Sequence, residues 1–203
     1  NGCIYNYPEL RSELEAQGYR LFSTGDTEVI LKAFHCWGDA CVERFHGMFA
    51  FAIFERDSGT VTLARDRFGI KPLYISQTNA TLRFASSLPA LLRGGDVDAS
   101  IDREALHTYM TFHAVVPPPR TILKGVRKVP PATTRRIEAD GTITDRKYWS
   151  PVYERKAADS ALSFEDWRDR VLEAVRVSVR RRMVADVPVG VLLSGGVDSS
   201  LIV

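Results

Sequence analysis

The chain has 203 residues, 45% of them hydrophobic and 26% charged, which is typical of a globular protein with one large or two small domains. The formal net charge is only +2, so charge gives no basis for binding nucleic acid or a membrane surface. No stretch approaches the ~18 apolar residues of a membrane-spanning helix. Three cysteines (Cys3, Cys36 and Cys41) are too few for a disulfide framework, and they indicate a reducing, cytoplasmic location.

The N-terminal part of the chain predicts two helices followed by four strands. The two helical segments, each ended by a glycine, are 8–17 and 26–37. Segments rich in β-branched and aromatic residues predict strands at 48–55, 60–66, 72–76 and 81–86. Because MFAFAIF (48–54) is apolar on both faces, the sheet should be covered on both sides. We therefore expect a layered α+β domain.

The C-terminal part has a different pattern. VVPPPR (115–120) contains three consecutive prolines, which exclude a helix or a central strand, and 129–149 predicts a hairpin that turns at Asp140-Gly141. Ser163 can cap the amide of Asp166 at the start of a long helix with an apolar stripe. An apolar strand at 189–193, a glycine loop and a new helix then predict the opening of a parallel α/β domain.

These changes of pattern divide the chain into three parts. Residues 1–95 form the first domain, 96–158 form a connecting segment with the proline-rich turn and the hairpin, and 159–203 begin the second domain.

The glycine-serine loop SGGVDSS (194–200) carries a chemical prediction. Gly195 and Gly196 allow a sharp turn whose N–H groups, with the start of the next helix, can hold a phosphate. Asp198 beside a phosphate makes sense if Mg²⁺ lies between them. This loop lacks the lysine of a Walker A loop. The predicted contacts to ATP and its pyrophosphate are Leu193, Ser194, Gly195, Gly196, Asp198 and Ser199, with Asp198 as the residue that reaches the metal.

The loop resembles that of the ATP pyrophosphatases known as PP-loop enzymes. The N-terminal half, from NGCIYN through STGDTEVILKAF and HGMFAFAIFERDSGTVTLARDRFGIKPLYI, resembles the glutaminase domain of glutamine-hydrolysing asparagine synthetases. The resemblance continues through LRFASSLPALL and VPPPRTILKGVRKVPP into SGGVDSS. It implies part of a four-layer αββα N-terminal-nucleophile glutaminase domain, followed by the start of a PP-loop synthetase domain.

The resemblance assigns roles to four residues near the N-terminus. Asn1 and Gly2 match an Asn-Gly pair that forms the oxyanion hole, and Asp26 matches the carboxylate that holds the α-amino group of glutamine. A helix N-cap is the structural alternative for Asp26. Cys3 stands among the glutamine contacts where the family usually has glutamate. The family's nucleophile is an N-terminal cysteine outside this sequence, which implies an inactive excerpt of a longer protein.

The implied reaction uses glutamine, ATP and Mg²⁺ to convert a carboxylate into an amide through an acyl-adenylate, releasing AMP and pyrophosphate. NGCIYN, FHAVVPPPRTIL and LRFASSLPALL resemble the subgroup that amidates an N-acetylglutaminylglutamine dipeptide in osmolyte biosynthesis, and aspartate is the alternative acceptor. An inactive scaffold and a PP-loop RNA-modifying enzyme are the alternatives from other classes. The sequence leaves open whether the protein is a homodimer.

Overall fold

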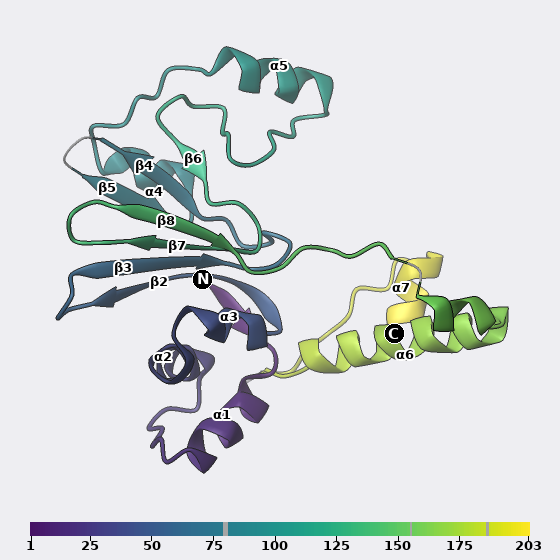
Figure 1. Ribbon diagram of the computed structural model, residues 1–203. Helices are drawn as coiled ribbons and strands as arrows, with labels where there is room; N and C mark the ends of the chain where they lie inside the picture. Colours follow the sequence, from purple (N-terminus) through teal and green to yellow (C-terminus); the bar gives the residue numbers. More distant parts are fainter. Residues whose placement is uncertain (79–80, 155, 186) are drawn as a thin grey trace. The chain divides into compact units, whose positions relative to one another are not determined.

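The computed structural model describes residues 1–78, 81–154, 156–185 and 187–203 (Figure 1). The chain divides into two compact units, Asn1–Ser150 and Pro151–Val203. The helices within the described residues are all too short or too polar to cross a bilayer.

The first unit contains two antiparallel sheets. The larger has the order β1-β2-β3-β7-β8 and is formed by Gly2–Ile4, Gly47–Glu55, Thr60–Arg65, Thr133–Ile137 and Ile143–Lys147. The smaller has the order β5-β4-β6 and is formed by Leu82–Ala85, Tyr74–Gln77 and Arg127–Lys128. The four strands predicted in the N-terminal part and the hairpin at Asp140-Gly141 are thus confirmed.

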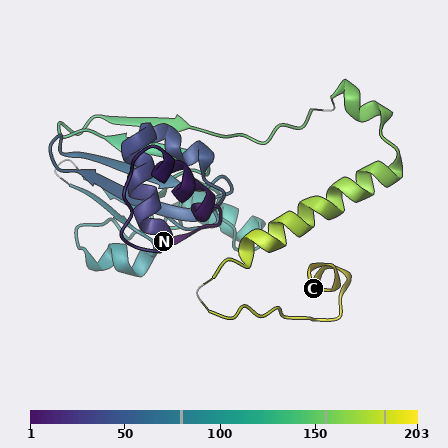
Figure 2. The ribbon, with the colours of Figure 1, turned by 90° about the horizontal axis from the view of Figure 1, so that it is seen from below.

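Helices flank the two sheets. The helices before β2 are α1 (Tyr7–Ala16), α2 (Asp26–Trp37), a 3-10 turn (Gly38–Ala40) and α3 (Cys41–Arg44), and they gather on one side of the larger sheet (Figure 1, Figure 2). Helix α4 (Leu88–Arg93) packs on β4 and β5, and α5 (Arg103–Thr111) follows it. Helices, two sheets and α4 make the αββα order, so the fold class predicted for the first domain is confirmed.

Each face of the larger sheet packs against a separate hydrophobic core. One core joins α1, α2 and α3 to β1 and β2, and its buried residues include Ile4, Leu14 and Phe49. The other includes Ala50 of β2 and Ile75 of β4, between the two sheets. Phe49 and Ala50 are consecutive and point to opposite faces, as the alternation along a strand requires.

The sequence predicts that the sheet is covered on both faces along MFAFAIF (48–54), and this is true only near the start of β2. Phe49 and Ala50 are buried, but Ala52 and Phe54, two and four positions beyond Ala50 on the same face, are exposed, and Phe54 is 61% exposed. The short second sheet therefore covers only part of this face.

The boundary between the units differs from the expected one. β7 pairs with β3 in the register Val61↔Ile137 through Ala64↔Thr134, and β8 pairs with β7. The hairpin expected in a connecting segment therefore completes the larger sheet, and the structure divides the chain after Ser150. Sequence patterns miss this because the pairing joins residues far apart in the chain.

The second unit contains a long helix and a short one. Helix α6 (Phe164–Arg182) begins with the predicted capping box, in which the Ser163 hydroxyl accepts from Asp166 N at 3.1 Å. A 3-10 turn (Ala157–Ala161) precedes it and α7 (Val197–Ile202) follows the glycine loop. Residues 189–193 are not a strand, contrary to the prediction, because no described strand pairs with them and a strand needs hydrogen-bonded neighbours.

Two glycines allow β1 and β2 to approach closely. A Cβ atom on Gly47 would lie 2.2 Å from the Cys3 carbonyl oxygen, and one on Gly2 would lie 2.0 Å from that of Met48. Gly2 also has φ +119°, a conformation that side chains oppose. The β1–β2 pairing thus depends on glycine in both strands.

We expect Gly47→Ala to destabilise the first unit by about 1–3 kcal/mol, because the new methyl group meets backbone atoms that cannot move independently. Differential scanning calorimetry of the full-length protein would measure the loss. Gly25→Ala is the matched control, since a Cβ there meets nothing within 4 Å and the backbone is extended. Equal transition temperatures for the two variants would contradict the close approach.

Candidate functional site

The outer edge of β1 carries backbone groups that β2 does not use. Asn1 and Ala50 exchange two backbone hydrogen bonds, of 3.0 and 2.9 Å, and Tyr5 N donates to His46 O at 2.7 Å. In an antiparallel ladder, hydrogen-bonded and non-hydrogen-bonded pairs alternate. The N–H groups of Gly2 and Ile4 therefore point away from β2. β1 is the first strand of its sheet, so they point outward from the edge.

Asp26 lies on this edge. Its Oδ2 accepts a hydrogen bond of 3.0 Å from Ile4 N, across 22 positions of the chain. Asp26 is the first residue of α2 and Gly25 is the N-cap, so the structural alternative for Asp26, a helix N-cap, is wrong. The carboxylate instead ties the start of α2 to β1.

The edge therefore brings two of the predicted glutamine contacts, Gly2 and Asp26, to the same side of β1. Gly2 N–H and Ile4 N–H point the same way and lie two residues apart, about 7 Å along a strand. The N–H of Gly2 faces outward, and the N–H of Ile4 donates to the Asp26 carboxylate. An outward N–H donor and a carboxylate at this spacing could hold the two polar ends of a small amino acid. Sequence patterns do not reveal this arrangement, because a backbone hydrogen bond leaves no motif.

A cavity of about 370 Å³ opens beside Asn1. It lies between the two sheets and is lined by Asn1, Ala50, Phe51, Ala52, Pro72, Leu73, Phe84, Ala85 and Ser86. Cys3 is half-buried and pairs in register with Met48. Opposed residues of a strand pair share a face, so Asn1 lies on the same face of the sheet as Cys3 and Met48.

Glu28 holds the loop that leads to Asp26. Its carboxylate accepts from Phe22 N at 2.9 Å, from Ser23 N at 2.6 Å and from the Ser23 hydroxyl at 2.8 Å. These hydrogen bonds to the charged form lower the pKa of Glu28 to about 2. No sequence pattern marks this role of Glu28, which stands two positions after Asp26 in STGDTEVILKAF.

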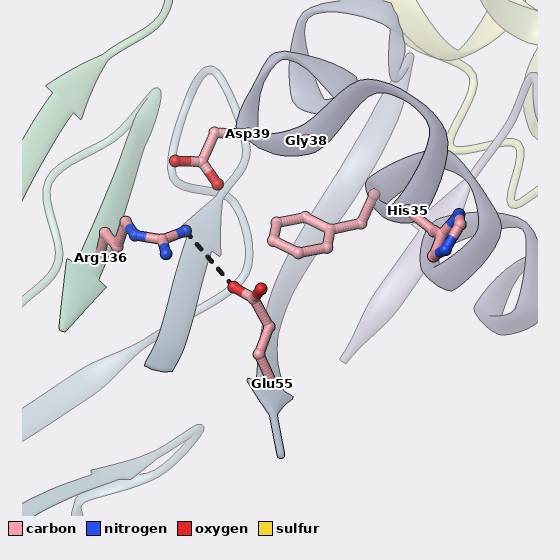
Figure 3. A pocket seen from close by; sticks show the side chains of 6 residues that line it. His35, Gly38, Asp39, Glu55 and Arg136 are labelled. Carbon is pink, nitrogen blue, oxygen red and sulfur yellow. Dashed lines mark hydrogen bonds and ion pairs between the residues drawn. The ribbon is translucent and has the colours of Figure 1, made fainter. Parts of the chain in front are cut away.

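A second cavity, of about 460 Å³, lies near the opposite end of β2 (Figure 3). It is lined by Phe34, His35, Gly38, Asp39, Glu55 and Arg136. Arg136 forms ion pairs with Glu55 at 3.3 Å and with Glu138 at 2.7 Å, which hold its guanidinium within the sheet. Glu55 is the last residue of β2, whereas β1 pairs with the first residues, so this cavity is not part of the edge site.

The glycine loop of the second unit has an ordered turn. The Ser194 and Ser199 hydroxyls are 3.0 Å apart, Ser199 Oγ donates to Gly196 O at 3.0 Å, and Gly195 has φ +80°. Gly196 is the N-cap of α7, and Leu193 and Asp198 are exposed beside the turn. Two converging hydroxyls and a glycine turn fit a phosphate group. Asp198 supplies one carboxylate, which suits Mg²⁺ that also binds phosphate oxygens.

Comparisons with known proteins find a matching family for each of the two parts of the chain. Residues 1–149 match the family model of the glutamine amidotransferase domain, and residues 170–203 match that of asparagine synthase. Glutamine-hydrolysing asparagine synthetase 1 of Bacillus subtilis (strain 168) is 41% identical over 203 residues, and synthetase 3 of the same strain is 36% identical over 202. A putative glutamine-hydrolysing asparagine synthetase of Mycobacterium tuberculosis (strain H37Rv) is 40% identical over 211 residues.

The alignments cover all of this chain but only part of each relative. The chain spans 31% of the length of the first Bacillus relative and of the Mycobacterium relative, and 32% of the second Bacillus relative. Among solved structures, the glutamine phosphoribosylpyrophosphate amidotransferase of B. subtilis, in complex with ADP and GMP, has a TM-score of 0.51 and 19% identity. That match covers 75% of this chain and 29% of the other, and it supports the fold alone.

The Glu28 carboxylate should stay ionised well below the usual range of glutamate. A carboxylate whose pKa is lower in the folded state stabilises the fold at pH values above its pKa in the unfolded chain, which is about 4.5 for Glu28. This stabilisation is lost as the pH falls through the folded-state pKa of about 2. We expect the Glu28 carboxyl resonance to titrate near pH 2 in an NMR experiment. A Glu28 midpoint equal to that of an unfolded peptide would contradict the loop contacts.

Proposed function

Since this chain belongs to the glutamine amidotransferase domain family, we propose that it contributes the glutamine site and the pyrophosphate loop of an ATP-dependent amidotransferase of asparagine synthetase type. The observation that carries the proposal is the edge of β1, where Gly2 N–H and the Asp26 carboxylate lie on the same side of the strand.

At the glutamine site, the two ends of the β1 edge bind different groups of the substrate. The Asp26 carboxylate binds the α-ammonium group of glutamine through a charge-assisted hydrogen bond. The Asn1 side-chain amide and Gly2 N–H donate to the oxyanion that develops when the glutamine amide is attacked. Cys3 follows these donors and stands where the family usually has glutamate. The attacking thiolate belongs to the N-terminal cysteine that the family uses, and none of the residues of this chain takes that role.

At the synthetase site, ATP supplies the activation of a carboxylate as its acyl-adenylate. Ser194, Gly195, Gly196 and Ser199 hold the departing pyrophosphate, with Leu193 beside them. Asp198 would hold Mg²⁺, which would supply positive charge to neutralise the pyrophosphate. The ammonia released from glutamine attacks the adenylate and gives an amide and AMP. The ordered hydroxyl pair and the glycine turn support this assignment.

We propose an N-acetylglutaminylglutamine dipeptide as the acceptor, on the resemblance of NGCIYN, FHAVVPPPRTIL and LRFASSLPALL to that subgroup. Aspartate is the second candidate, because the bacterial relatives are called asparagine synthetases. Such an enzyme acts on small soluble molecules, in the cytoplasm.

The proposed activity is tested by pyrophosphate release from the full-length protein with ATP, Mg²⁺ and glutamine. We expect release when the dipeptide is added, with one AMP and one glutamate formed per pyrophosphate. Release with aspartate alone would overturn the dipeptide and retain the reaction type. If a protein that folds and hydrolyses glutamine released no pyrophosphate with the dipeptide or with aspartate, both proposed acceptors would be wrong.

Asp26→Asn should weaken glutamine binding without breaking the link to β1, because the asparagine oxygen can still accept from Ile4 N–H. Loss of a charge-assisted hydrogen bond is worth about 1.5–3 kcal/mol, so we expect kcat/KM for glutamine to fall about ten- to hundredfold, mainly through KM. The rate with added ammonium salts should not change, since ammonia bypasses the glutamine site.

Asp39→Asn is the matched control for this variant. Asp39 follows the other end of α2, and its Oδ1 has no hydrogen bond among the described residues. If both variants changed KM equally, or if Asp26→Asn lowered the ammonia-dependent rate as well, the proposed role of Asp26 would be wrong.

A further inference from the structure

Asp66 is a buried carboxylate immediately after β3. It is 1% exposed, and its two oxygens accept four backbone hydrogen bonds. Oδ1 accepts from Phe68 N at 3.2 Å and from Ile70 N at 2.9 Å, and Oδ2 accepts from Phe49 N at 3.2 Å and from Lys71 N at 3.0 Å. A buried carboxylate with this many backbone partners fixes the position of the backbone around it.

The contact with Phe49 links Asp66 to the β1 edge. Phe49 is the register partner of Gly2, in a pair that makes no hydrogen bonds between β1 and β2. The Phe49 backbone groups therefore face β3, where pairing of β2 with β3 ends at Ala50↔Arg65. There Asp66 N donates to Phe49 O at 2.9 Å and the Asp66 carboxylate accepts from Phe49 N. Asp66 thus holds both backbone groups of the residue opposite Gly2.

Arg65 also fixes the loop after β3, through the carbonyl groups of the loop. It is 6% exposed, and its guanidinium donates to Lys71 O at 2.8 Å, to Gly69 O at 2.7 Å and to Val129 O at 2.6 Å. The carboxylate of Asp66 binds N–H groups of the loop and the guanidinium of Arg65 binds its carbonyl groups. The loop 66–71 is therefore a fixed support rather than a mobile connection.

We propose that Asp66 is a positioning residue for glutamine hydrolysis, which sets the place of Gly2 N–H by fixing Phe49 on the other side of β2. This inference rests on the proposed function. Gly2 is the register partner of Phe49, and a Cβ atom on Gly2 would lie only 2.8 Å from Phe49 Cα, so a shift of β2 at Phe49 displaces Gly2. An oxyanion donor must be placed accurately, and a displacement of about 1 Å can cost about 10²-fold in rate.

The decisive variant is Asp66→Asn in the full-length protein. Asparagine keeps the shape of the side chain, but its NH₂ group would face two N–H donors and cannot accept from them. We expect kcat for glutamine hydrolysis to fall about 10²-fold. KM for glutamine and the ammonia-dependent rate of pyrophosphate release should not change, because neither depends on the oxyanion donor. A role in folding alone would lower both rates together.

Asp102→Asn is the matched control. Asp102 is also a largely buried carboxylate of the first unit, with a side chain 15% exposed, and it accepts from Glu104 N at 3.0 Å and Ala105 N at 3.1 Å at the start of α5. This variant should lose stability and keep the full kcat for glutamine. Equal kcat in the Asp66 and Asp102 variants would overturn the proposal while leaving the proposed function in place.

Hydrogen exchange of the unchanged protein gives a second test, which does not require any variant to fold. The amides of Phe49, Ile70 and Lys71 share the Asp66 carboxylate, so they should exchange with one common opening free energy. Exchange of Phe49 independently of Ile70 and Lys71 would contradict the proposal. If the full-length protein hydrolysed no glutamine, the proposed function would fail and so would the positioning role, whatever the exchange showed.

Discussion

The close pairing of β1 with β2 is the constraint on which the rest of the candidate site depends. Glycine at Gly2 and Gly47 lets the two backbones approach, and the Asn1–Ala50 hydrogen bonds fix the register. Once the register is set, the alternation of the ladder decides which N–H groups face outward. The outward position of Gly2 N–H and the link from Ile4 to Asp26 both follow from it.

The layered fold explains why the site draws on such different elements. Asp26 comes from the helical layer, the donors come from an edge strand, and the cavity beside Asn1 opens between the sheets. A sheet with one core on each face can bring these together only at an edge, because elsewhere the backbone groups are paired. Asp66 contributes from the side opposite this edge, through Phe49.

Local sequence patterns predicted the elements that are regular and amphipathic. The bounds of α2 follow from its apolar face and from Gly38, and the capping box before α6 follows from Ser163 and Asp166. β1 has only three residues and begins at a glycine with φ +119°, so no periodicity marks it. The Asp26–Ile4 bond and the Asp66 contacts were missed for a related reason, since they join side chains to backbone groups that any residue would provide. Helix α5 was missed because several of its apolar side chains, such as Met110, are exposed.

The hydrogen bond from Ile4 N–H to Asp26 also affects how β1 can pair with other chains. An edge strand offers unpaired N–H groups that can recruit a strand from another molecule and start aggregation. On β1 the Asp26 carboxylate covers the N–H of Ile4, and a negative charge beside the edge opposes the approach of a foreign backbone. The carboxylate proposed to select glutamine thus also covers a backbone donor of β1, the first strand of the described sheet.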